Sequence, residues 1–154
     1  MDTLYCRQEK LTDGLIREID SMLDAYYHAT VASNGIPPYD FLWDQYRSLE
    51  QMGILLTTTA RYRDRVLVGL CMYICLEHPH HAGLMVAECD TISTRLEYRG
   101  SGIAKKLYLY TEPLLRIRGV SKIVNRYRHV YNAKPMFEGL GFDAVVTCYV
   151  KELT

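Results

Sequence analysis

Residues 98–104 have the sequence Tyr98-Arg99-Gly100-Ser101-Gly102-Ile103-Ala104, and an apolar run at helical spacing follows them directly. An alternating segment over residues 84–94 precedes them and favours a strand. The order strand, glycine-rich turn, helix predicts an anion site. Glycines let a ligand approach the backbone closely, and the first turn of a helix presents unpaired N–H groups. The spacing matches neither GxxxxGK(S/T) nor GxGxxG, which excludes the two common nucleotide-binding fingerprints.

This turn resembles the acyl-CoA loop of the GNAT N-acetyltransferase family, whose signature is Gln/Arg-x-x-Gly-x-Gly/Ala. Arg99, Gly102 and Ala104 occupy the three specified places. The resemblance extends over the whole chain, because GNAT domains end with an Asn-led short helix, a Gly-Phe pair and a last strand. Residues 44–50 and 133–135 are similar to segments of short phage-encoded GNAT proteins. The alternative for the turn is a purely structural bend before a helix.

Periodicity and chain breakers predict six strands and four helices. The strands are expected at residues 4–8, 54–62, 66–76, 84–94, 122–128 and 143–153, and the helices at 12–32, 39–52, after 102, and within 131–142. The resemblance then implies a mixed α/β (α+β) fold. Its central, mostly antiparallel sheet is splayed between the fourth and fifth strands and flanked by about four helices. The length predicts a single domain, residues 1–154.

Composition narrows the class of protein. Eighteen basic side chains balance eighteen acidic ones, which argues against a nucleic-acid or membrane surface. No apolar run reaches the length of a membrane span, and the sequence at Met1 does not resemble a signal peptide. The five cysteines, an odd number, are expected to be buried thiols in a reducing compartment. We therefore expect a cytoplasmic protein, in the host cytoplasm if the chain is phage-encoded.

The resemblance implies acetyl-CoA as the cosubstrate. It places the pantetheine arm along the backbone of Ile92, Ser93 and Thr94, with the N–H near Thr94 polarising the acetyl carbonyl. It places the diphosphate on a run of backbone amides and adds one side chain from the next helix. These residues are Arg99, Gly100, Ser101, Gly102, Ile103, Ala104 and, on the next helix, Asn132.

Two carboxylates are candidates for the general base. Glu88 and Asp90 are two residues apart in the segment predicted as a strand, so they point to one face of it. A base must reach the amine directly or through a water. Glu88 is the leading candidate, because it falls where the histone-type GNAT enzymes carry a strand glutamate, and Asp90 is the second. Alternatively, both face solvent or pair with Arg61, Arg63 or Lys122.

The proton donor departs from the family pattern. Many GNAT proteins carry a tyrosine where this chain has Phe137, which has no proton to give. Either the thiolate leaves unassisted, as a thiol with a pKa of about 8.5 allows, or Tyr131 or Tyr149 substitutes. A covalent route through Cys89 or Cys148 is excluded because no histidine stands at a partner position. The departure leaves a second function open, a CoA-binding module with little or no catalysis.

Two further segments bear on the acceptor site and on metal binding. In a GNAT-like domain the first two helices adjoin the acceptor site, so residues 37–43, Pro-Pro-Tyr-Asp-Phe-Leu-Trp, either face the acceptor or pack in the core. His78, His80 and His81 lack a cysteine or a second cluster, so no metal is expected. The expected activity is direct acetyl transfer, in a ternary complex, to a primary amine of a small molecule or peptide. A homodimer is an open alternative to a monomer.

Overall fold

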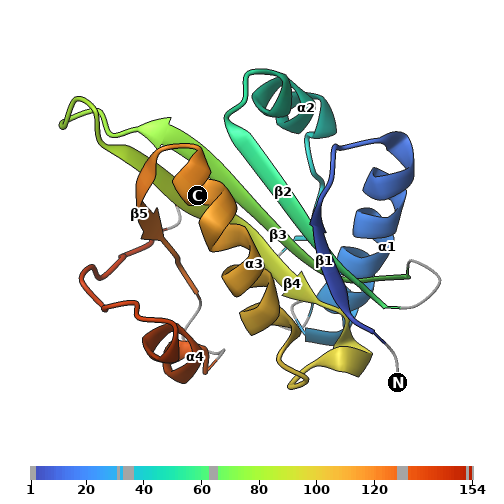
Figure 1. Cartoon of the computed structure of the whole chain (residues 1–154). Helices are drawn as coiled ribbons and strands as arrows, with labels where there is room; N and C mark the ends of the chain where they lie inside the picture. Colours follow the sequence, from blue (N-terminus) through green and yellow to red (C-terminus); the bar gives the residue numbers. More distant parts are fainter. Residues whose placement is uncertain are drawn as a thin grey trace.

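A computed structural model of the chain describes residues 3–30, 32, 37–62, 66–127, 132–151 and 153 (Figure 1). In chain order, its elements are β1 (Tyr5–Gln8), α1 (Asp13–Thr30), α2 (Trp43–Gln51), β2 (Leu55–Tyr62), β3 (Val66–Glu77), β4 (Met85–Thr94), the 3-10 helix η2 (Leu96–Tyr98), α3 (Ile103–Ile117), β5 (Val120–Val124) and α4 (Lys134–Gly139). None of the helices described is long and apolar enough to cross a membrane.

The five strands form one sheet in the order β1-β2-β3-β4-β5. The first three pairings are antiparallel, and β5 lies parallel to β4. β5 pairs only with Met85–Glu88, whereas β4 continues to Thr94. The predicted fold class is therefore confirmed: a mixed, mostly antiparallel sheet in which the fourth and fifth strands separate, with four helices around it.

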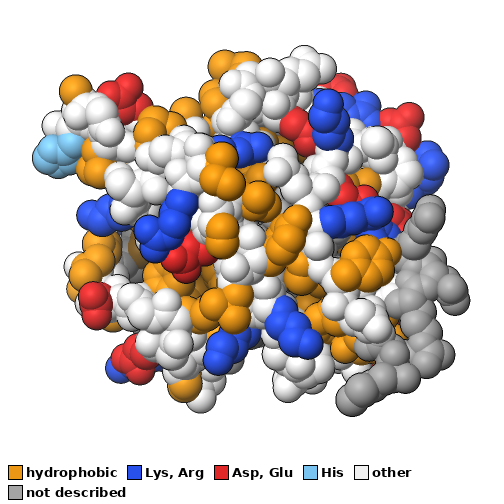
Figure 2. Space-filling view, viewed as in Figure 1, with side chains coloured by type: hydrophobic (Ala, Val, Ile, Leu, Met, Phe, Trp, Pro, Cys, Tyr) orange, Lys and Arg blue, Asp and Glu red, His pale blue; other side chains and the backbone are white. Residues whose placement is uncertain are grey.

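The helices cover both faces of the sheet. Alternate residues of β3 point to opposite faces. Leu70 and Met72 pack with α1 and α2, whereas Cys71 and Tyr73 pack with α3 and α4. β3 is consequently buried on both faces. In Figure 1, α3 crosses the front of the sheet, and Figure 2 shows that the Lys and Arg side chains on this side are scattered instead of forming one basic face.

Gly69 in β3 lets α3 lie close to the sheet. A Cβ atom added there would stand 2.7 Å from Ile103 Cγ2 and 2.9 Å from Leu107 Cδ1. Both side chains are fully buried and belong to the first turns of α3. A glycine inside an apolar strand is the sequence signal of such a close approach, and here it fixes the position of the helix that follows the glycine-rich turn.

We expect Gly69→Ala to lower the free energy of unfolding by about 1–3 kcal/mol, because the added methyl forces the two α3 side chains off their rotamers. Urea unfolding measures the change. Gly139→Ala is the control, since nothing lies within 4 Å of the corresponding Cβ, and its effect should stay within about 0.5 kcal/mol. A Gly69→Ala protein as stable as the wild type would contradict the close approach.

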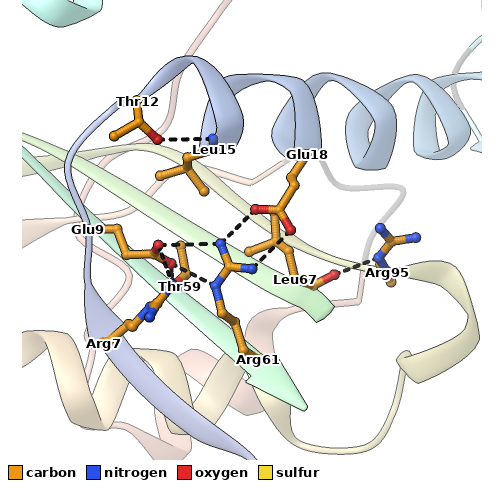
Figure 3. A network of polar contacts seen from close by, with 9 residues as sticks. All are labelled: Arg7, Glu9, Thr12, Leu15, Glu18, Thr59, Arg61, Leu67 and Arg95. Atoms are coloured by element: carbon orange, nitrogen blue, oxygen red, sulfur yellow. Dashed lines mark hydrogen bonds and ion pairs between the residues drawn. The ribbon is translucent and has the colours of Figure 1, made fainter. Parts of the chain in front are cut away.

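Arg61 joins three elements through a buried ionic network (Figure 3). Its side chain, on β2, is 3% exposed and lies 2.8 Å from both Glu9, beyond β1, and Glu18, on α1. Arg7 also contacts Glu9, at 2.6 Å. Burial opposes ionisation of Glu9, but hydrogen bonds from Arg7, Arg61 and Thr59 outweigh it and hold the pKa of this carboxyl below its usual range.

The segment after α4 corrects one prediction. Residues 143–151 and 153 have no regular secondary structure, and Val145, Val146, Tyr149 and Val150 are 78–91% exposed. The strand predicted over 143–153 is therefore wrong. β-branched residues favour a strand only where a neighbouring edge supplies hydrogen bonds, and no strand in the described part of the chain pairs with this segment.

Some predicted bounds shift. α2 begins at Trp43 instead of residue 39, because Leu42 still has non-helical dihedrals, φ −77° and ψ 71°. β5 occupies Val120–Val124 instead of residues 122–128, since it begins directly after Gly119, a left-handed residue with φ +80°. The hairpin predicted at residues 63–65 and the end of the predicted strand at Arg128 lie outside the described residues. All five cysteines are free thiols, but Cys148 is exposed and not buried as predicted.

Candidate active site

The carboxyl half of β4 has one open edge. β3 pairs with it through Thr94, but β5 pairs no further than Glu88. The backbone N–H of Arg95 donates to the carbonyl oxygen of Val68 in β3, at 2.9 Å. Because successive N–H groups of a strand point to opposite sides, the N–H groups of Thr94 and Ile92 point away from β3. Two backbone donors therefore line the open edge.

Ser93 lies between these two donors and presents a different feature. Its side chain is 8% exposed, and its hydroxyl oxygen has no hydrogen-bond partner among the residues described. A buried hydroxyl without a partner is costly. Among the described residues, the open edge thus presents two backbone donors that an extended polar ligand would satisfy, whereas Ser93 stands opposite Leu70 and its unpaired hydroxyl lies on the face covered by α1 and α2.

The glycine-rich turn meets the requirements of an anion site. Gly100 and Gly102 have φ values of +75° and +80°, and a Cβ added to either meets nothing within 4 Å. The space above the backbone is therefore open. The N–H groups of Ile103 and Ala104, in the first turn of α3, have no intrahelical acceptor, and none of the described side chains caps this helix. These residues fit a diphosphate.

Other parts of the turn are already engaged. The N–H of Arg99 donates to the Leu96 oxygen at 3.2 Å, and the N–H of Ser101 donates to the Tyr98 oxygen at 3.3 Å. The Arg99 guanidinium carbon lies 4.6 Å from the centre of the Tyr26 ring on α1, which is a cation–π distance. The side chain of Arg99 therefore connects the turn to α1.

The remaining predicted site residues come from the segments before and after α4. Asn132 is described and exposed, two positions before the start of the helix at Lys134. Tyr131, a predicted proton donor, lies outside the described residues. Tyr149, its alternative, is 91% exposed in the unpaired segment after α4.

A β-bulge shapes the strand that carries the carboxylates. Glu88 stands opposite Ile74, and Thr91 stands opposite Met72, so the pairing register is interrupted around Asp90. Ile74 and Met72 both face α1 and α2. Glu88 and Asp90 share this face, as predicted, because Asp90 is contacted from α2.

Each carboxylate has a polar partner that the sequence did not reveal. Glu88 Oε2 lies 3.1 Å from Arg126 Nη1, with both side chains at least half exposed. The Tyr46 hydroxyl donates to Asp90 Oδ2 at 3.0 Å. Burial and the neighbouring Asp90 charge raise the pKa of Tyr46, so it stays a donor. Arg61, proposed as an alternative partner of these acids, instead binds Glu9 and Glu18.

Phe137 and a pair of tyrosines occupy the opposite face. Phe137 is 8% exposed, and its ring centre lies 5.7 Å from that of Tyr108 and 5.5 Å from that of Phe142. The hydroxyls of Tyr73 and Tyr108 both donate to Asn125 Oδ1, at 3.2 and 2.6 Å. Burial raises the pKa of both phenols. Sequence reasoning missed this cluster, whose only local signal is Asn125 directly after β5.

The segment that leads into α2 packs against the core and also lines a hollow at the surface. Phe41 and Trp43 stack at 4.9 Å between ring centres and pack against the core. They also line a hollow together with α1. In the histidine loop, the His80 N–H donates to His78 Nδ1 at 3.2 Å. Among the described residues, no group of three His, Cys, Asp or Glu side chains is placed to hold a metal ion.

Comparisons with known proteins agree with this arrangement. The model of the acetyltransferase (GNAT) family matches residues 19–142. No curated protein matches the sequence. Among solved structures, an acetyltransferase of Trypanosoma brucei is 20% identical with a TM-score of 0.74, over 98% of this chain and 100% of that one. A ribosomal-protein-alanine N-acetyltransferase of Brucella melitensis biovar Abortus 2308 is 24% identical with a TM-score of 0.70, over 99% and 100%.

An aminoglycoside acetyltransferase from an uncultured soil metagenomic sample, in complex with sisomicin, is also similar. It is 14% identical with a TM-score of 0.74, over 98% of this chain and 97% of that one. At these identities the structures share the fold with this chain, and the family model carries the assignment of the family.

Proposed function

Because the chain belongs to the acetyltransferase (GNAT) family, we propose that it transfers an acetyl group from acetyl-CoA to a primary amine by direct transfer in a ternary complex. The observation that carries the proposal is the open edge of β4, which leads directly into an uncapped helix N-terminus. Residues 1–154 act as one domain in this proposal, as a monomer or a homodimer. The acceptor amine belongs to a small molecule or a peptide.

Named residues hold the donor. The N–H groups of Ile92 and Thr94 and the backbone at Ser93 bind the pantetheine arm, and Thr94 polarises the acetyl carbonyl. The free amides of the glycine-rich turn and of the first turn of α3 bind the diphosphate, and Asn132 faces the donor from the start of α4. When bound, acetyl-CoA supplies a thioester that the amine attacks at carbon while the thiolate leaves.

The carboxylates hold the proton released by the amine. Glu88 is the proposed general base, because it stands where β4 and β5 separate, and Asp90, oriented by Tyr46, is the second candidate. Phe137 carries no hydroxyl, so Tyr131 is our proposed proton donor. A thiolate whose conjugate acid has a pKa of about 8.5 also leaves without assistance.

Calorimetric titration with acetyl-CoA tests the donor site, with CoA and ATP as controls. We expect acetyl-CoA and CoA to bind and ATP not to bind. At about a hundred times its dissociation constant, the donor should stabilise the fold by roughly 2.7 kcal/mol, visible as a rise in melting temperature. Release of free thiol on adding an amine then separates an enzyme from the alternative, a CoA-binding module with little or no catalysis.

We expect Glu88→Gln to lower kcat by about a hundredfold without changing the affinity for acetyl-CoA, because general-base catalysis is worth at least this much. Thiol release gives kcat, and calorimetry gives the affinity. The matched control is Glu112→Gln, which also alters an ion-paired glutamate, on α3. A full-rate Glu88→Gln enzyme would assign the base to Asp90 or to bulk water.

A further inference from the structure

A hollow of about 430 Å³ lies between α1 and the segment that leads into α2. Carboxylates and aromatic rings make up most of its wall. They are Asp20, Asp24, Asp40, Tyr39, Phe41 and Trp43. The described residues that line the hollow include no Lys or Arg side chain, so this part of its wall carries negative charge at neutral pH.

In the part of the chain that the structure describes, none of the three carboxylates pairs with a Lys or Arg side chain. Asp20 accepts a hydrogen bond from the neutral indole Nε1 of Trp43 at 2.9 Å. Asp24 lies 3.4 Å from His28 Nε2, which balances its charge only when the histidine is protonated. Within the described residues, Asp40 makes no hydrogen bond or ion pair. Like charges gathered in a concave site focus a negative potential and attract cations.

The aromatic rings favour the same ligands. Besides the stack of Phe41 on Trp43, the rings of Tyr39 and Phe41 lie 5.9 Å apart. Ring faces carry partial negative charge and attract ammonium groups, with tryptophan the strongest. Carboxylates beside such faces suit an ammonium group on a partly apolar skeleton and repel phosphates and carboxylates.

One residue connects the hollow to the candidate base. The Trp43 and Tyr46 rings lie 5.5 Å apart, and the Tyr46 hydroxyl bonds Asp90 on β4. The hollow and the carboxylates of β4 thus share the face of the sheet covered by α1 and α2. A molecule with several amines can place one ammonium group in the hollow and another amine near β4.

We propose that this hollow binds the ammonium groups of a polycationic small-molecule amine, a linear polyamine or an aminoglycoside, whose free amine is acetylated beside Glu88 and Asp90. The inference rests on the proposed function and names its acceptor class. The hollow should favour a molecule with two or more amines over a monoamine, because a monoamine that reacts near β4 has no second ammonium group to place in the hollow.

Trp43 is the single tryptophan of the chain, so its fluorescence reports binding in the hollow independently of catalysis. The titrants are spermidine, a triamine, and n-butylamine at the same concentrations. Spermidine should give a saturable change whose dissociation constant rises with ionic strength, because the attraction is electrostatic. n-Butylamine should give no saturable change over the same range.

Variants locate the site. Asp40→Asn should weaken spermidine binding by roughly fivefold, the worth of one partly exposed ion pair, and adding Asp24→Asn should weaken it further. The KM for spermidine should rise in parallel, with the KM for acetyl-CoA unchanged. Asp44→Asn is the matched control, since Asp44 is an exposed carboxylate of α2 outside the hollow, and it should bind spermidine like the wild type.

The outcomes separate this inference from the proposed function. If spermidine and n-butylamine bind equally, or if Asp40→Asn binds like Asp44→Asn, the polycation site is overturned even if acetyl-CoA still reacts with other amines. If spermidine binds at Trp43 as described but no amine releases thiol from acetyl-CoA, the proposed function fails and the cation site stands.

Discussion

Gly102→Glu should lose CoA binding by roughly a hundredfold or more, because hydrogen bonds to charged groups are each worth about 1.5–3 kcal/mol and the new carboxylate would occupy their space. The Cβ position of Gly102 faces open space at the start of α3. An added side chain there projects over the amides that fit a diphosphate and repels it. Calorimetric titration with CoA measures the loss, and circular dichroism checks that the fold remains.

Backbone strain must be separated from blockage of the site. Any residue but glycine at φ +80° costs about 1–2 kcal/mol, which lowers stability without touching a ligand. Gly119 has the same φ, +80°, and also faces open space, but it follows the opposite end of α3. Gly119→Glu should therefore be destabilised similarly yet bind CoA normally. If both variants bind CoA like the wild type, the turn is only a bend before a helix.

The parts of this site that can be predicted from sequence are those whose conformation depends on residues adjacent in the chain. The turn at Gly100 and Gly102 was predictable because positive φ and a free helix N-terminus depend on a few adjacent residues. The strand β3 was also predictable from adjacent residues. It is buried on both faces, and its sequence is therefore one nearly continuous apolar run. The signature in the turn and the order of elements together were enough to indicate the family.

What sequence did not predict depends on distant partners. The bond from Tyr46 to Asp90 spans 44 positions and needs the bulge in β4. The ion pair between Glu88 and Arg126 depends on where β5 ends, because Arg126 follows the last residue of that strand by two positions. The strand predicted after α4 failed for the same reason, because Val145 and Val146 have strand-forming side chains but no described strand pairs with them. Pairing is a property of the assembled sheet, whereas propensity belongs to the segment.

The largest effect on stability should come from Arg61→Ala, with a loss of about 3 kcal/mol or more, because removing one partner of a buried ionic network leaves the others uncompensated. Glu9, which is 14% exposed, would keep only Arg7 as an ionic partner, and Glu18 would lose the guanidinium that it binds. Urea unfolding at neutral pH measures the loss. Arg116→Ala is the control, since Arg116 forms an exposed pair with Glu112 and should cost less than about 1 kcal/mol.

The dependence of stability on pH distinguishes lost charge pairing from lost packing. The pKa of Glu9 is depressed in the folded protein, so its contribution is complete above the unfolded value of about 4.3 and is lost as pH falls through the folded value. Arg61→Ala removes the Arg61 share of this depression, leaving those of Arg7 and Thr59, and should make the acid limb of the stability curve less steep. Adding Glu9→Gln should then restore part of the lost stability, because it removes a largely buried charge that keeps only Arg7 as an ionic partner. If the acid limb is unchanged and Glu9→Gln gives no recovery, Arg61 stabilises the fold by packing alone.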